Sequence, residues 1–146
     1  PLQDMPDQVK SKRLGHLDFL LLHCPDYLYN GEEVSETFQL FRESEKVRHF
    51  GVSNFKPSQV SLLQSYCPFP LLVNQVEINI HNISTLLDGT LDQCREKRIS
   101  PQAWCPLGGV AYPAWSNTFT KQDQFRIKKE LELQSKKYDA YSKAYA

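Results

Sequence analysis

The stretch DFLLLHCPD, residues 18–26, is a short apolar run that stops at His23 and continues into Cys24-Pro25-Asp26. A run of this length between polar and turn-forming residues is typical of a strand buried on both faces of a parallel sheet. A doubly wound nucleotide-binding sheet would carry a G-x-G-x-x-G loop after its first strand, whereas Cys24-Pro25-Asp26 follows here and the only glycine pair, Gly108-Gly109, comes after the fourth strand. The stretch therefore favours a barrel of alternating strands and helices.

Three further runs of the same kind follow along the chain. They cover residues 48–54, 71–77 and 99–105, so that successive strand starts lie about 23 to 30 residues apart. A (β/α)8 barrel of ~250 residues uses ~31 residues for each unit. We therefore predict an α/β fold, a partial (β/α)8 TIM barrel of about four βα units, with residues 1–146 forming one domain.

Amphipathic patterns predict helices between and after these strands. Asn30 is expected to cap residues 32–46, and Pro57 suits the first turn of the next helix. Ser84 is expected to cap one continuous helix that ends at Lys97. The last predicted helix covers residues 124–137 and buries Ile127, Leu131 and Tyr138.

Charge and hydropathy exclude several classes of function. The 17 basic residues balance the 17 acidic ones, so the chain offers no long-range field to nucleic acid or to an anionic membrane. No apolar run approaches the ~20 residues that a membrane-spanning helix needs, and the first residues do not resemble a secretory signal. We expect a cytoplasmic protein that binds neither nucleic acid nor membrane.

The cysteines are Cys24, Cys67, Cys94 and Cys105, and none belongs to a C-x-x-C pair. Their scatter favours reduced thiols and no metal site. Cys24 follows His23, which suggests a nucleophile and its base. On a strand, however, adjacent side chains point to opposite faces, so we expect the two not to share a proton.

Polar or flat side chains mark the ends of the predicted strands, where the chemistry of a barrel is found. Asn54 and Gln75 carry amide donors and acceptors that match a nicotinamide carboxamide, and Ser53 adds a hydroxyl. Trp104 could stack on the ring, and His23 could hydrogen-bond a substrate carbonyl. Gly51 permits close approach of the backbone near that site.

Each of these residues also has a purely structural interpretation. A histidine after an apolar run is more often a hydrogen-bonded structural residue, and Ser53-Asn54 could simply cap the following helix. Gln75 could tie two strands together, and Trp104 could belong to the core. The functional interpretation depends on the recurrence of such groups at successive strand ends.

The same stretches carry a family resemblance. DFLLLHCPD, KVRHFGVSNF (residues 46–55), NQVE (74–77) and AWCPLGG (103–109) resemble the aldo-keto reductases, in family order and spacing. LLDGTLDQC (86–94) is similar to a bacterial branch of oxidoreductases. The resemblance implies a (β/α)8 barrel that binds NADPH and reduces small aldehydes or ketones to alcohols.

The resemblance also implies roles for single residues. His23 matches the histidine of the family's catalytic tetrad, which orients the substrate carbonyl. Ser53, Asn54 and Gln75 match the residues that hold the carboxamide, and Trp104 matches the position that stacks on the nicotinamide. Cys105, Leu107 and Gly108 fall in the loop that passes the pyrophosphate. No metal is implied.

The chain departs from the family pattern in several places. Cys24 stands where the branch usually has arginine, and Cys105 where it usually has serine. The tetrad's aspartate, tyrosine and lysine precede the histidine in the family, yet the residues before His23 include no tyrosine. The family's final strand, which grips the 2′-phosphate, should follow Ala146. We therefore expect a partial chain that is inactive alone and prone to self-association through its open half barrel.

Two other functions stay open. One is a truncated or non-catalytic relative that keeps only part of the nicotinamide site. The other is a small thiol protein that uses Cys24 and Cys105, although neither has an adjacent lysine or arginine. The identity of the substrate is not determined by these residues.

Overall fold

The computed structural model describes residues 15–79, 82–106 and 120–138. The chain divides into two compact units, residues 1–76 with 88–102, and residues 77–87 with 103–146. Leu107 and Gly108 lie outside the described residues.

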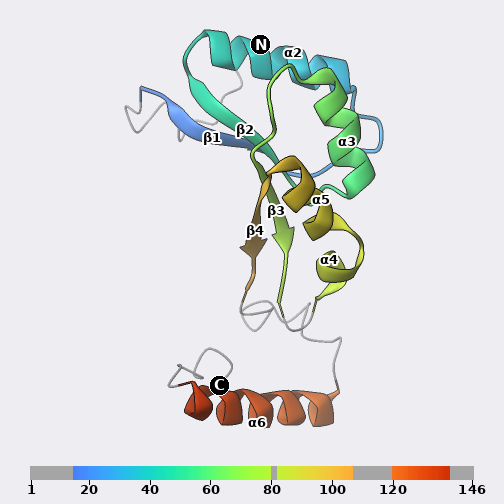
Figure 1. Ribbon diagram of the computed structural model, residues 1–146, viewed down its shortest axis with the longest axis vertical. Coiled ribbons are helices and arrows are strands. Elements are labelled where there is room, and N and C mark those ends of the chain that lie inside the picture. Colours follow the sequence, from blue (N-terminus) through green and yellow to red (C-terminus); the bar gives the residue numbers. More distant parts are fainter. Residues whose placement is uncertain (1–14, 80–81, 107–119, 139–146) are drawn as a thin grey trace. The chain divides into compact units, whose positions relative to one another are not determined.

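One four-stranded sheet, with the order β1-β2-β3-β4, organises the fold. The strands are β1 (Leu17–Leu22), β2 (Val47–Ser53), β3 (Val73–Glu77) and β4 (Ser100–Trp104). β1 pairs in parallel with β2, and β2 in parallel with β3. The Ser100 amide donates to the Leu72 carbonyl at 2.7 Å, and the arrows of β3 and β4 run the same way (Figure 1). The four predicted parallel strands are thus confirmed to within two residues at each end.

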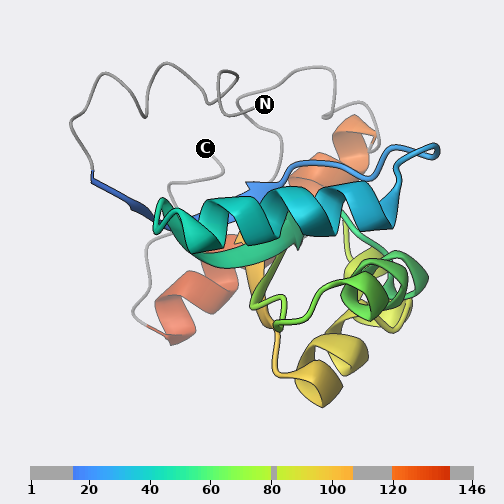
Figure 2. The same ribbon diagram turned by 90° about the horizontal axis from the view of Figure 1, so that it is seen from above.

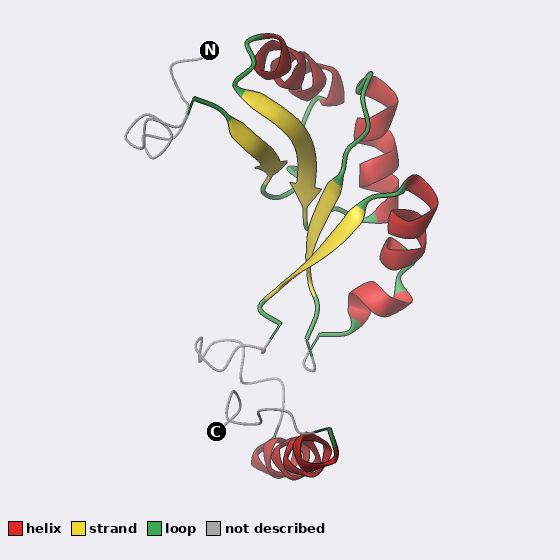
Figure 3. Ribbon diagram, turned by 60° about the vertical axis from the view of Figure 1, so that its left-hand side comes forward, coloured by secondary structure: helices red, strands yellow, loops and turns green. Residues whose placement is uncertain are grey.

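Helices α2 (Gly31–Glu43), α3 (Pro57–Tyr66) and α5 (Thr90–Lys97) lie on one face of the sheet (Figure 3). Asn30 caps α2 as predicted, since its side-chain oxygen accepts the Glu32 amide at 3.0 Å. Pro57 occupies the first turn of α3, where no intrahelical N–H is needed. The alternation of strand and helix therefore follows local signals in the sequence.

The hydrophobic core lies between these helices and the sheet. α2 runs along β1 and β2 (Figure 2), and the Phe38 and Phe50 rings stack with their centroids 4.5 Å apart. Val52 and Leu63 are fully buried beside them. Aromatic stacking and burial of apolar surface hold the helix layer on the sheet.

Burial differs among the strands. β2 and β3 are largely buried, but Asp18 and Phe19 of β1 are exposed, as are the first four residues of β4. The prediction that all four strands are buried on both faces was therefore wrong for β1 and β4. The physical reason is that both are outer strands of the sheet and the described helices of this unit cover only one face.

The predicted helix from Ser84 to Lys97 is interrupted. α4 (Ser84–Leu87) ends before Asp88, and α5 begins at Thr90. Gly89 has φ +84°, a conformation that no helix contains and that glycine adopts without strain. The Asp88 carboxylate accepts a hydrogen bond from the Thr90 amide at 3.0 Å, so one N–H in the first turn of α5, which has no partner within the helix, is paired.

In the second unit, α6 (Lys121–Lys137) begins three residues before its predicted start. Thr120 and Asp123 form a reciprocal capping box that extends the helix. No residue of α6 is buried, and Tyr138 is 68% exposed, so the predicted burial of this helix was wrong. An apolar stripe is buried only where another element packs on it, and sequence periodicity does not supply that partner. No helix in the described ranges is long and apolar enough to cross a membrane.

Candidate functional site

The carboxyl ends of β1, β2 and β3 bring His23, Ser53, Asn54 and Gln75 together within the first unit. The parallel register pairs Leu22 with Val52 and Ser53 with Gln75. Consequently His23, which directly follows β1, lies beside the end of β2. The Asn54 side-chain amide donates to the His23 carbonyl at 3.4 Å, a contact that joins two chain segments 31 residues apart.

The Gln75 carbonyl fixes the turn after β2. It accepts the Asn54 backbone amide at 2.8 Å and the Ser53 hydroxyl at 2.9 Å. Asn54 has φ +61°, in the left-handed region that asparagine tolerates better than most residues. The two hydrogen bonds hold the chain in this bend, so that the Asn54 side chain projects at the end of the strand instead of continuing it.

Ser53 is only 2% exposed, and its hydroxyl is used within the protein. It donates to Gln75 and accepts from the Asn54 side-chain amide at 3.1 Å. In this structure, Ser53 therefore positions Asn54. The Gln75 side chain is half-buried, and its amide nitrogen makes a long contact of 3.5 Å with the Gln102 side-chain oxygen. Another acceptor at a shorter distance could take the place of the Gln102 oxygen.

Sequence reasoning missed two residues here, Gln102 and Asn74. Gln102 lies on β4, two residues before Trp104, and alternation along the strand could have placed both on one face. Asn74 is 1% exposed and donates to the Phe55 carbonyl at 2.9 Å, directly after Asn54. Asn74 thus holds the backbone on the C-terminal side of the bend at Asn54. In the sequence, its place in NQVE, directly before Gln75, could have indicated this role.

His23 and Cys24 are in contact, contrary to the prediction. Cys24 Sγ lies 3.6 Å from His23 Nδ1, and Asn54 Nδ2 lies 3.6 Å from the same sulfur. Strand alternation does not apply because β1 ends at Leu22, before both residues. In the Nε2–H tautomer, the thiol donates to Nδ1 and the ring's one N–H, at Nε2, is left for another partner.

The remaining predicted site residues belong to the second unit or lie outside the described residues. Trp104 ends β4 and, like Cys105, belongs to the second unit. Cys105 has φ +45°, so the chain bends sharply after the strand. Leu107 and Gly108 lie outside the described residues.

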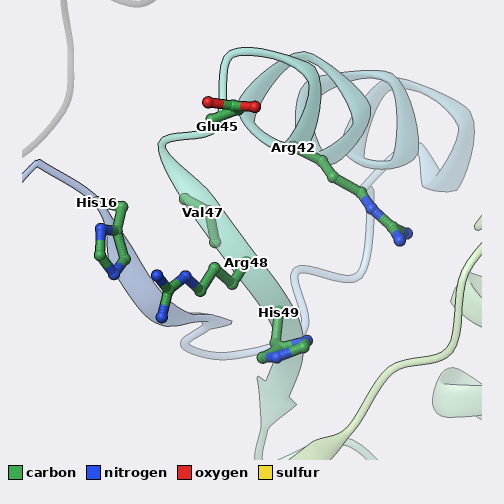
Figure 4. Close-up of a pocket in the computed structure, with 6 residues that line it drawn as sticks. All are labelled: His16, Arg42, Glu45, Val47, Arg48 and His49. Carbon is green, nitrogen blue, oxygen red and sulfur yellow. The ribbon is translucent and has the colours of Figure 1, made fainter.

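A hollow of about 490 Å³ lies at the opposite end of β1 and β2. Figure 4 shows its six lining residues, which are His16, Arg42, Glu45, Val47, Arg48 and His49. Arg48 extends towards His16, whereas Arg42 points away from it (Figure 4). The Arg48 guanidinium pairs with Asp18 at 2.9 Å, and the Arg42 guanidinium lies over the Phe69 ring. These charges do not converge on one point. Among the described residues, no group of three His, Cys, Asp or Glu side chains is arranged to hold a metal.

Comparison with known proteins defines the class to which this fold and these strand ends belong. The sequence pattern of the aldo/keto reductase family matches residues 6–146, and the chain belongs to that family. Oxidoreductase YdhF of Escherichia coli is 55% identical over 94 residues, which cover 64% of this chain and 32% of YdhF. The 6-dehydroglucose reductase of Agrobacterium fabrum is 45% identical over 101 residues, which cover 69% of this chain and 34% of that enzyme.

Solved structures agree with the fold. A thermostable aldo-keto reductase, Tm1743, in complex with the inhibitor epalrestat has a TM-score of 0.71 at 25% identity. The match covers 89% of this chain and 43% of that protein, so the described fold corresponds to part of a barrel. The chain spans about a third of the length of the curated relatives it matches.

Proposed function

We propose that this chain supplies the nicotinamide-carboxamide contacts and the carbonyl-orienting histidine of an NADPH-dependent reductase that converts aldehydes or ketones to alcohols. The observation that carries the proposal is the network at the ends of β1, β2 and β3. There, Asn54, held by Gln75 and Ser53, lies against His23. Membership of the aldo/keto reductase family supports the reaction class.

The polar groups of this network fit a carboxamide. A carboxamide offers one acceptor oxygen and two N–H donors, and Asn54 and Gln75 each carry the complementary set. Gln75 is half-buried, and exchange of its 3.5 Å contact with Gln102 for a shorter hydrogen bond would improve its geometry. Ser53 acts beneath them by fixing the Asn54 side chain.

His23 is proposed to orient the substrate. Its Nδ1 lies 3.6 Å from Cys24 Sγ. In the Nε2–H tautomer, which we assign to it here, Nδ1 accepts from the thiol and Nε2–H donates to a carbonyl oxygen, stabilising the charge that develops there. When bound, NADPH supplies the hydride that goes to the carbonyl carbon. By resemblance to the family, Trp104 is assigned to stacking on the nicotinamide, and Cys105, Leu107 and Gly108 to the loop that passes the pyrophosphate.

The proton must come from a tyrosine with a neighbouring lysine, as the resemblance implies, and the residues before His23 include no tyrosine. A phenol with a pKa near ~10 is a poor acid at neutral pH without a cationic neighbour. We therefore propose that the 146-residue chain alone does not reduce carbonyl compounds, and that the protein acts in the cytoplasm on a small carbonyl substrate.

A chimera tests the proposal. The matching segment of the Agrobacterium fabrum 6-dehydroglucose reductase is replaced by that of this chain, and reduction of 6-dehydroglucose is followed by loss of NADPH absorbance. We expect turnover by the chimera, with kcat/KM lowered roughly 10²-fold or more in His23→Ala and much less in Cys24→Ala. Equal activity of the His23→Ala chimera and its parent would remove His23 from the mechanism.

Binding of the cofactor is measured separately by titration of NADPH fluorescence. Gln75→Ala should weaken NADPH binding, whereas Gln102→Ala, the matched control, should leave it unchanged or strengthen it because it frees the Gln75 amide. The alternative function, a truncated or non-catalytic relative, predicts that the complete protein lacks the tyrosine and lysine of the tetrad, so that it binds NADPH through Gln75 without turnover even though the chimera is active.

A further inference from the structure

Cys24 differs from the other three cysteines, which are buried or half-buried, in its surroundings. It is exposed, and its sulfur lies within 3.6 Å of both His23 Nδ1 and Asn54 Nδ2. Cys67 and Cys94 are buried, and burial raises the pKa of both thiols. The Asn54 amide, at the end of the neighbouring strand, holds the His23 carbonyl and the Cys24 sulfur. A thiol within hydrogen-bond distance of an imidazole is the arrangement found around activated nucleophiles.

We propose that Cys24 and His23 form a nucleophile–base pair, which makes Cys24 a covalent modification site for α,β-unsaturated carbonyl compounds. Such compounds combine a carbonyl group, which His23 Nε2–H could bind, with an electrophilic β-carbon that a thiol attacks. The inference goes beyond carbonyl reduction and depends only on the contact between His23 and Cys24, so it stands or falls independently of the proposed reductase.

The addition is balanced without a further reagent. His23 Nδ1 takes the thiol proton as the Cys24 sulfur forms a bond to the β-carbon. The π electrons of the C=C bond move to the carbonyl oxygen and give an enolate. The proton on His23 then returns to the α-carbon, which leaves a saturated carbonyl adduct. Nothing is oxidised or reduced, and no group leaves.

Because Asn54 contacts Cys24, modification of the thiol would also disturb the hydrogen bonds of Asn54. Asn54 Nδ2 donates to Cys24 Sγ, to the His23 carbonyl and to Ser53 Oγ, so these groups share one amide. A substituent on the sulfur would occupy the space beside the imidazole and compete for that amide. The adduct would therefore block the position at which His23 meets a substrate carbonyl.

The test measures the alkylation rate of each cysteine. The 146-residue chain is treated with limiting N-ethylmaleimide, a conjugated carbonyl compound, and adducts are quantified by peptide mass spectrometry. We expect Cys24 to react about tenfold faster in the folded chain than in the urea-unfolded chain. The gain is set below that of a full general base because water also removes thiol protons. Equal rates in the two states would overturn the proposal without any substitution.

A variant pair identifies the base. His23→Ala should lower the rate at Cys24 about tenfold and leave Cys105 unchanged, and added imidazole should restore it. His49→Ala is the matched control, since His49 is an exposed histidine that contacts Phe19 instead of a thiol. Continued protection of Cys67 and Cys94 shows that each variant is folded. A His23→Ala chain that is folded and alkylated at the original rate contradicts the pair.

Discussion

Gly51 gives the sharpest test of how the strand ends are held in place. A Cβ atom at this position would lie 2.5 Å from the Val73 carbonyl oxygen and 2.7 Å from Leu21 Cδ2. The Leu21 side chain has room to adjust, but the carbonyl belongs to the neighbouring strand, where Gly51 is paired with Val73. The glycine is required by the close approach of β3 and by the Leu21 side chain, rather than by a bound ligand.

Gly51→Ala should therefore destabilise the fold by about 1–3 kcal/mol, the usual cost of inserting a methyl group into a packed site. The upper part of that range is expected because the carbonyl oxygen would have to move about 0.9 Å to reach the 3.4 Å at which ordinary contact begins. The strain should reach the site, since Ser53 and Gln75 pair two residues further along the same strands.

Urea unfolding monitored by circular dichroism measures the effect as a shift in midpoint at constant slope. Gly15→Ala is the control, because a Cβ at Gly15 would meet nothing within 4 Å. That change should be neutral or stabilising by a few tenths of a kcal/mol. If Gly51→Ala and Gly15→Ala change the free energy of unfolding by the same amount, the packing argument is wrong.

Two further predictions concern the cap of α6 and the open face of the sheet. The Thr120 hydroxyl and backbone amide donate to Asp123, which lowers the pKa of that carboxyl. Because the folded-state pKa is lowered, the cap stabilises α6 above the ordinary carboxyl pKa, and this stabilisation is lost as the pH falls through the folded value. The protection of the first α6 amides against hydrogen exchange, relative to their intrinsic rates, should therefore decrease below about pH 4. Asp123→Asn should abolish this pH dependence, and its persistence would contradict the cap. Phe19 is 46% exposed on an outer strand, so the chain should self-associate, and Phe19→Lys should reduce its sedimentation coefficient towards that of a monomer. A wild-type chain that sediments as a compact monomer would refute the second prediction.

Local signals in the sequence predicted most of the fold. Apolar runs bounded by turn residues located all four strands, while Asn30 and Pro57 located the starts of two helices. These features act over a few residues, through the hydrogen bond of a cap or the fixed φ of proline. They can therefore be recognised without knowledge of the rest of the chain. The break at Asp88-Gly89 was equally local, but the apolar periodicity across it concealed the turn.

Tertiary structure decided what the strand ends do to one another. His23, Asn54 and Gln75 could each be proposed from sequence, but the shared Gln75 carbonyl, the contact of Asn54 with His23 and the support from Asn74 depend on strand register. The His23–Cys24 contact depends on where β1 ends, because one more strand residue would turn the two side chains to opposite faces. Sequence by itself determined which chemical groups are present and which lie at strand ends. Their pairing was decided only by the fold, because hydrogen bonds between residues about 20 to 30 positions apart form only once the parallel strands are in register.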